Sequence, residues 1–134
     1  MSGGVVHFIF LLLLNLLPAI ALAADFQTPA ITATELNARQ LTPEAYLVVD
    51  VRDQNEYRKG HIPDAINIPQ PELELHLDEL QNPNGVVIYC INGRRTKLAE
   101  QTLLDHGFDN LYHIEHSLNG WLMKNLPINK GRKP

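Results

Sequence analysis

The sequence predicts an α/β fold in which a small parallel sheet is flanked by helices on both faces. Two segments, 46–51 and 86–89, are almost continuously apolar and rich in β-branched residues. Such runs are typical of strands that are buried on both sides in a parallel sheet. Shorter segments with helical spacing alternate with the strands along the chain, and this alternation predicts a sheet covered by helices on both faces.

The remaining elements follow from local patterns of apolar and turn residues. The predicted strands are 31–32, 46–51, 65–68, 86–89 and 110–115. The predicted helices are 33–39, 54–59, 72–80, 97–106 and a last one that begins at Ser117.

Polar residues and glycines mark the ends of the first helices. Thr32 or Thr34 can cap the first helix, and Asp53 can cap the second, which is expected to stop at Gly60. Leucines at helical spacing predict the third helix, 72–80.

The fourth and fifth helices have equally local signals. The fourth is expected to end at Gly107, and Ser117 can cap the fifth. The side chains expected to form one face of the fourth helix are Leu98, Ala99, Thr102 and Leu103.

Composition limits the class of protein. The chain has 134 residues, of which 45% are hydrophobic and 19% are charged, which is enough for one domain with its own core. The formal net charge of −4 argues against nucleic acid as a partner. A single cysteine, Cys90, cannot form an internal disulfide.

The first 24 residues have the pattern of a signal peptide, and residues 25–134 are expected to form the domain. An apolar run at 5–17 is followed by Pro18 and by a small-x-small cleavage pattern at 21–23. The protein is therefore expected to be periplasmic or otherwise exported, without stable membrane association after cleavage. Because the segment before the apolar run lacks Lys and Arg, an uncleaved membrane anchor is the alternative.

The lone thiol lies where the predicted strand 86–89 turns into a helix. Ligands bind at this carboxyl edge in open α/β sheets. Gly93 lets a tight loop point several N–H groups inward, and the helix N-terminus carries partial positive charge. With Arg94 and Arg95 alongside, the loop favours a thiolate at Cys90, the reactive form of cysteine. This hypothesis needs a thiol that a substrate can reach, so a side chain sealed in the hydrophobic interior would count against it.

Other polar residues near the predicted sheet edge are interpreted as structural. Asp50, Arg52 and Glu56 are expected to form an ion-pair network that ties the second long strand to its following helix, with Arg52 and Glu56 spaced for a helical pair. His61 is expected to be a satisfied turn histidine, and Trp121 a packing residue.

Three stretches in order along the chain resemble the signatures of single-domain rhodaneses, and most of all the small exported kind that uses thiosulfate. They are 49–69, which contains the sequence GHIPDAINIP, the loop 90–96 with the sequence CINGRRT, and the Gly-Trp and Leu-Pro pairs within 120–127. Two positions depart from the common form: Ile91, where many members have Arg, and Asn119, where Gly is frequent.

The resemblance implies a rhodanese-like fold and a two-step sulfur transfer. Cys90 would attack the outer sulfur of thiosulfate, release sulfite and become a persulfide, which a cyanide or small thiol acceptor then resolves. The implied substrate-binding residues are those of the loop, and no metal or other cofactor is required. These residues are Ile91, Asn92, Gly93, Arg94, Arg95 and Thr96.

Several alternatives stay open at this point. A catalytically quiet persulfide carrier or partner-binding module would keep the same fold. A phosphatase or arsenate reductase is less compatible, because four residues separate Cys90 from Arg95 and related enzymes of that kind have one more. The histidines at 106, 113 and 116 fit no standard set of metal ligands.

Overall fold

The computed structural model describes residues 25–131, and the predicted signal peptide lies outside the described residues. The chain forms a five-stranded sheet with the order β1-β5-β4-β2-β3, and all strand pairs are parallel. This confirms the predicted fold class. The strands are β1 (Ala30–Ile31), β2 (Leu47–Asp50), β3 (Ile66–Asn67), β4 (Val86–Tyr89) and β5 (Leu111–Ile114).

Helices follow the predicted order with two differences. The segment predicted as one helix at 72–80 forms two short 3-10 helices, because His76 between them has a φ of −128°, outside the helical range. The fourth helix begins three residues earlier than predicted. The helices are α1 (Ala33–Arg39), α2 (Gln54–Lys59), η1 (Gln70–Leu75), η2 (Leu77–Leu80), α3 (Arg94–Asp105) and α4 (Ser117–Met123).

The caps of the first two α-helices are confirmed. The Thr32 hydroxyl accepts a hydrogen bond from the Glu35 N–H, and the Glu35 carboxylate accepts one from the Thr32 N–H. This reciprocal pair is a capping box. The Asp53 carboxylate accepts from the Glu56 N–H at 2.8 Å, and α2 ends at Gly60.

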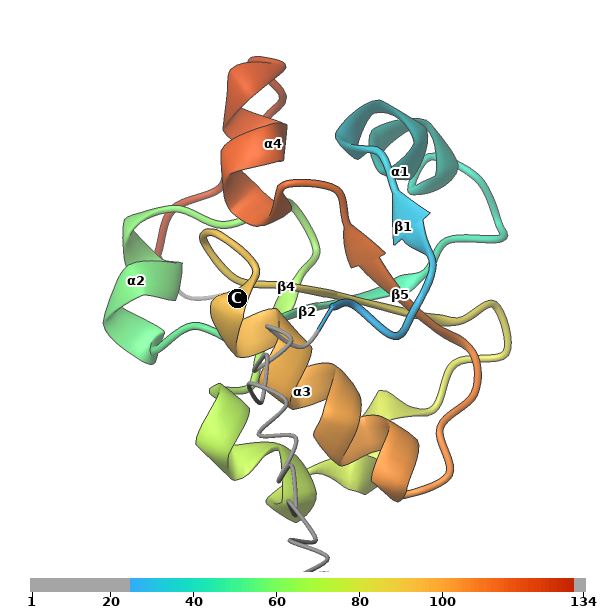
Figure 1. Ribbon diagram of the computed structural model, residues 1–134. Coiled ribbons are helices and arrows are strands. Elements are labelled where there is room, and N and C mark those ends of the chain that lie inside the picture. Colours follow the sequence, from blue (N-terminus) through green and yellow to red (C-terminus); the bar gives the residue numbers. More distant parts are fainter. Residues whose placement is uncertain (1–24, 132–134) are drawn as a thin grey trace, which may run out of the picture.

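Two apolar layers cover the two faces of the sheet. Along β4, Val87 and Tyr89 pack against the layer that includes residues of α1, α2 and α4, whereas Val86 and Ile88 pack against residues of α3, η1 and η2. Figure 1 shows α1 and α4 above the sheet and α3 below it. Cys90, directly after β4, belongs to the second layer.

The buried face of α3 differs from the prediction. Leu98, expected in that face, is 58% exposed, and Thr102 is half-buried. The buried residues are Thr96, Ala99, Glu100 and Leu103. Of the two polar residues among them, Thr96 hydrogen-bonds the nearby Cys90, whereas Glu100 bonds Gln27 and Thr28, which are far away in the sequence.

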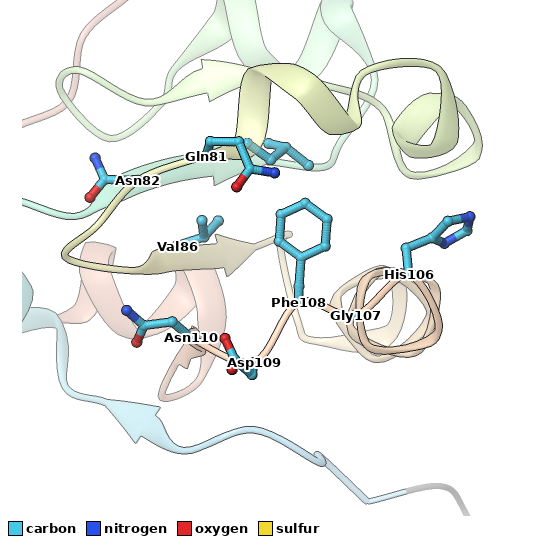
Figure 2. Close-up of a pocket in the computed structure, with 9 residues that line it drawn as sticks. Gln81, Asn82, Val86, His106, Gly107, Phe108, Asp109 and Asn110 are labelled. Atoms are coloured by element: carbon cyan, nitrogen blue, oxygen red, sulfur yellow. The ribbon is translucent and has the colours of Figure 1, made fainter.

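The topology places a switch point at the carboxyl ends of β2 and β4. After β2 the chain continues to β3 on one side, and after β4 it continues to β5 on the other. Ligands bind at such a switch point in open α/β sheets. A separate pocket, drawn in Figure 2, lies at the opposite edge, before β4 and β5, where Val86, Phe108 and Asn110 contribute to its lining. Across residues 25–131, none of the helices has the length and apolar character needed to cross a bilayer.

Candidate active site

Cys90 lies at the carboxyl end of β4, at the switch point. Its side chain has 0% exposure and takes part in the apolar layer next to α3. The sequence-based hypothesis required a thiol within reach of a substrate, and this burial counts against it. The sulfur nevertheless lies against a polar loop, since the Gly93 N–H donates a hydrogen bond to Cys90 Sγ at 3.0 Å.

Gly93 shapes the loop through its backbone. Its φ of 97° is in the left-handed region, where glycine has no steric penalty, and it forms the N-cap of α3. The loop turns tightly enough that the Asn92 carboxamide oxygen accepts from the Arg94 N–H at 3.2 Å. As a result α3 starts at Arg94, and its first N–H groups lie at the loop around the sulfur.

The loop lowers the pKa of the Cys90 thiol below its ordinary value. Burial acts in the opposite direction and raises the pKa, because it disfavours the thiolate. Hydrogen bonds from the Thr96 hydroxyl and from the N–H groups of Thr96, Asn92 and Gly93 outweigh that effect. The site can therefore hold a larger fraction of thiolate at neutral pH than an ordinary buried cysteine would.

The two loop arginines differ in their surroundings. Arg95 donates two hydrogen bonds to the Glu56 carboxylate on α2, at 2.7 and 3.1 Å, so its charge is shared with that group. Arg94 is exposed to solvent. Glu56, which was expected to pair with Arg52, instead joins α2 to the active-site loop.

Asp50 and Arg52 form a buried ion pair at the end of β2. The Arg52 side chain donates to both Asp50 carboxylate oxygens at 2.7 to 3.1 Å and to the Gly60 carbonyl oxygen at 2.7 Å. Both side chains are at most 5% exposed. The pair therefore ties the end of β2 to the end of α2, as its structural interpretation predicted.

His61 has the surroundings of a structural residue. Its ring stacks on the Tyr57 ring with centroids 3.7 Å apart, and its Nδ1 lies 2.8 Å from the Tyr57 carbonyl oxygen. Its backbone pairs with Asn129 in an isolated antiparallel bridge. His61 thus fixes the turn before β3 and the chain after α4.

The segment after β5 holds the other side of the loop. The Leu118 N–H donates to the Cys90 carbonyl oxygen at 2.9 Å, and the Asn119 N–H donates to the Ile91 carbonyl oxygen at 3.2 Å. The Ile91 side chain packs against the apolar layer that contains Trp121. The Ile91 side chain thus packs the loop against the apolar layer, and the Ile91 carbonyl group anchors the loop to α4.

Ser117 was expected to cap α4, but it is the first residue of that helix. His116 occupies the N-cap position instead, and both residues have a positive φ, of 59° for His116 and 53° for Ser117. The Ser117 hydroxyl is buried without a hydrogen-bond partner.

The Gly-Trp pair at 120–121 has a packing role. A Cβ on Gly120 would collide with the Glu115 carbonyl oxygen, so only glycine lets α4 approach the end of β5 this closely. Trp121 is 1% exposed, and its indole N–H donates to the Pro127 carbonyl oxygen at 2.8 Å. The interpretation of Trp121 as a packing residue is confirmed.

The part of the chain that the structure describes brings no three His, Cys, Asp or Glu side chains together as metal ligands. His113 is buried beside Glu100, while His106 and His116 are exposed.

Comparison with known proteins places the chain in a family. Residues 32–124 match the model of the rhodanese-like domain, and the chain belongs to that family. It is 31% identical to a sulfurtransferase of Allochromatium vinosum over 98 residues, covering 73% of this chain and 92% of the relative. It is 29% identical to the thiosulfate sulfurtransferase GlpE of Actinobacillus pleuropneumoniae over 101 residues, covering 72% and 94%.

A third relative is a candidate sulfur carrier by name. This Bacillus subtilis protein, YrkF, is 30% identical over 96 residues, and the chain covers about half of it, 52%, with 72% of the chain aligned. Among solved structures, a rhodanese-related protein of Thermoplasma volcanium superposes with a TM-score of 0.66 at 29% identity, covering 75% of this chain and 97% of that one. Sulfur transfer is therefore the chemistry that recurs among the relatives.

Proposed function

We propose that this protein is a thiosulfate sulfurtransferase in which Cys90 carries the sulfur. The Cys90 thiolate attacks the outer sulfur of thiosulfate and forms a new S–S bond. The bond between the outer sulfur and the sulfonate sulfur breaks, and its electron pair leaves with sulfite. Cyanide or a small thiol then attacks the outer sulfur of the Cys90 persulfide, and the thiolate returns.

One observation carries this proposal: Cys90 Sγ accepts the Gly93 N–H at 3.0 Å within a loop whose hydrogen bonds lower the thiol pKa. N–H groups that are already oriented stabilise negative charge on sulfur without reorganising during the reaction. Both the thiolate and the persulfide are anions, so the same donors serve both states. The Thr96 hydroxyl hydrogen-bonds the same sulfur and adds to this stabilisation.

The charges near the loop suit a dianionic donor. Arg94 is exposed beside the loop, and Arg95 lies behind it with part of its charge balanced by Glu56. Thiosulfate carries two negative charges, which favour approach to such a surface. The overall charge of −4 does not repel the donor locally, because the loop itself is basic.

A second candidate, a persulfide carrier without turnover, is favoured by the burial of Cys90. A thiol with 0% exposure must become accessible before it can take up or release sulfur. A carrier would benefit from keeping the persulfide away from water until a partner opens the loop. The named carrier among the relatives supports the same candidate.

Mass spectrometry and turnover separate these possibilities. The protein is treated with thiosulfate, and Cys90 is examined for the added mass of one sulfur atom, with Cys90→Ser as the control. Thiocyanate is then measured after cyanide is added. An enzyme loads sulfur and turns over many times, whereas a carrier loads once. Failure to load, together with hydrolysis of an aryl phosphate or reduction of arsenate, would overturn the proposal.

We also propose that the chain is exported and cleaved after residue 23 or 24. The apolar run at 5–17 and the small residues at 21–23 support this. The intact mass of the protein recovered from an expressing bacterium reports cleavage directly. A full-length mass in the membrane fraction would favour the anchored alternative.

A further inference from the structure

The segment before β1 lies against the active-site loop. The Phe26 ring is in contact with Gly93: a Cβ placed on Gly93 would come within 2.8 Å of Phe26 Cζ. Gly93 is the residue whose N–H donates to Cys90 Sγ. The half-buried ring therefore occupies the outer side of the turn that positions this donor.

Phe26 is held between groups of β5 and α3. Its ring stacks on the His113 ring with centroids 3.8 Å apart and an interplanar angle of 12°. Lys97 Nζ lies 5.0 Å from the ring centroid, in the range of a cation–π contact. The ring is therefore fixed, although the segment that bears it has no helix or strand of its own.

The residues next to Phe26 are anchored to a buried polar cluster. The Gln27 N–H donates to the Glu100 carboxylate at 3.0 Å, and the Thr28 hydroxyl donates to the same carboxylate. His113 Nδ1 lies 3.0 Å from the Thr28 hydroxyl and 3.1 Å from Glu100. Together Thr28, Glu100 and His113 form what we call the anchor cluster.

Burying a cluster that contains a carboxylate costs free energy, whereas burying apolar side chains does not. Glu100 is 1% exposed and His113 is 6% exposed. Glutamate is almost never fully buried unless its oxygens are paired, because removing a carboxylate from water is expensive. Each described contact of the Glu100 carboxylate with Gln27 and Thr28 fixes the segment that carries Phe26.

We propose that Phe26 is a positioning residue for sulfur transfer: its ring holds Gly93 so that the Gly93 N–H stays on the Cys90 sulfur, and the anchor cluster holds the ring. Phe26 touches neither donor nor acceptor and acts through Gly93. It also shields the outer side of the turn from water, which strengthens the hydrogen bond to a thiolate in a medium of lower polarity. This inference rests on the proposed role of Cys90.

The test measures the thiol pKa from the pH dependence of thiolate absorbance in the ultraviolet, which is specific because Cys90 is the only cysteine. Phe26→Ala removes the ring that contacts Gly93, so the hydrogen bond from the Gly93 N–H to the thiolate should weaken. Because this bond is made to a charged group, the thiol pKa should rise by roughly half to one unit. Phe26→Leu keeps apolar contact and should give a smaller rise. The kcat for thiosulfate should fall in the same order.

Phe108→Ala is the matched control. Phe108 is another half-buried phenylalanine, but it lies at the opposite edge of the sheet, in the pocket of Figure 2. Its truncation should lower the free energy of unfolding and leave the thiol pKa unchanged. Measuring every variant at high salt reduces the contribution of the Lys97 charge, because salt screens a half-buried charge in part and leaves a short hydrogen bond unaffected.

Thr28→Val tests the anchor cluster without altering Phe26. The thiol pKa should rise in this variant too, by less than in Phe26→Ala. If Phe26→Ala is folded and keeps the wild-type thiol pKa, or if Phe108→Ala shifts it equally, the inference is overturned. The failure of wild-type protein to form a persulfide would instead refute the proposed function, and the two failures are distinguishable because the pKa is measured without thiosulfate.

Discussion

The ion pair between Glu56 and Arg95 gives the sharpest test of how α2 supports the active-site loop. The change is Glu56→Gln, which removes the charge and keeps the size of the side chain. The pair lowers the pKa of Glu56 from 4.5 to about 2, chiefly through the hydrogen bonds that Arg95 donates. At about 1.4 kcal/mol per pKa unit this corresponds to roughly 3 kcal/mol.

Partial exposure reduces that figure. Both side chains are about one-third exposed, at 32% and 33%, so water screens the pair. We expect Glu56→Gln to lower the free energy of unfolding at pH 7 by about 1–2 kcal/mol, measured by urea denaturation. The same change at Glu74, an exposed carboxylate on η1, is the matched control and should have an effect within about 0.5 kcal/mol.

The stabilisation from the Glu56–Arg95 ion pair should depend on pH, and its direction follows from the lowered pKa of Glu56. A carboxyl group with a lowered pKa in the folded state stabilises the protein above its unfolded pKa of 4.5, and this stabilisation is lost as the pH falls towards about 2. The difference between wild type and Glu56→Gln should therefore shrink to less than about half its neutral value by about pH 3. A difference that is the same at pH 3 and pH 7 would refute the electrostatic argument. The thiol pKa of Cys90 should change little, because the loop hydrogen bonds dominate it.

Three further substitutions test other parts of the site. Arg52→Met leaves Asp50 buried and unpaired, and should cost about 3–5 kcal/mol in urea denaturation; a loss under about 1 kcal/mol would contradict a structural role. Thr96→Val removes a hydroxyl that lowers the thiol pKa, so that pKa should rise and persulfide formation at neutral pH should slow; an unchanged titration would exclude this hydrogen bond. Gly120→Ala forces a methyl group onto the Glu115 carbonyl oxygen, and should destabilise the fold by roughly 3 kcal/mol or more; a wild-type melting temperature would show that α4 shifts freely.

Local sequence patterns were sufficient for the fold and for the place of the thiol. The apolar runs of β2 and β4 are typical of strands buried in a parallel sheet. Thr32 and Asp53 are typical helix-capping residues, and each accepts a hydrogen bond from the N–H group three residues further on. Cys90 follows β4 directly, so its position at the carboxyl edge needed no tertiary information.

What the sequence could not provide depends on pairs of residues far apart. Glu56 and Arg95 are separated by 39 positions, and Thr28 and Glu100 by 72. A charged residue such as Glu100 is expected on the solvent side of a helix, so the buried face of α3 was placed wrongly. Nor does the spacing of apolar residues report a backbone angle, which is why the break at His76 was missed.

Because Cys90 is buried, the contacts between distant residues share one role, which is to hold the hydrogen-bond donors around its sulfur. Removing the sulfur from water raises the thiol pKa, so every hydrogen bond that opposes this effect must keep its geometry. The donors lie on a short loop and on the first turn of α3. The loop is held from α2 through Arg95, from α4 through Leu118 and from the segment before β1 through Gly93. Loss of the Phe26 contact with Gly93 should therefore change the thiol pKa, because the Gly93 N–H donates to the sulfur. Loss of the Glu56–Arg95 ion pair should act mainly on the free energy of unfolding. Thiol titration and denaturation therefore report on different contacts of the loop.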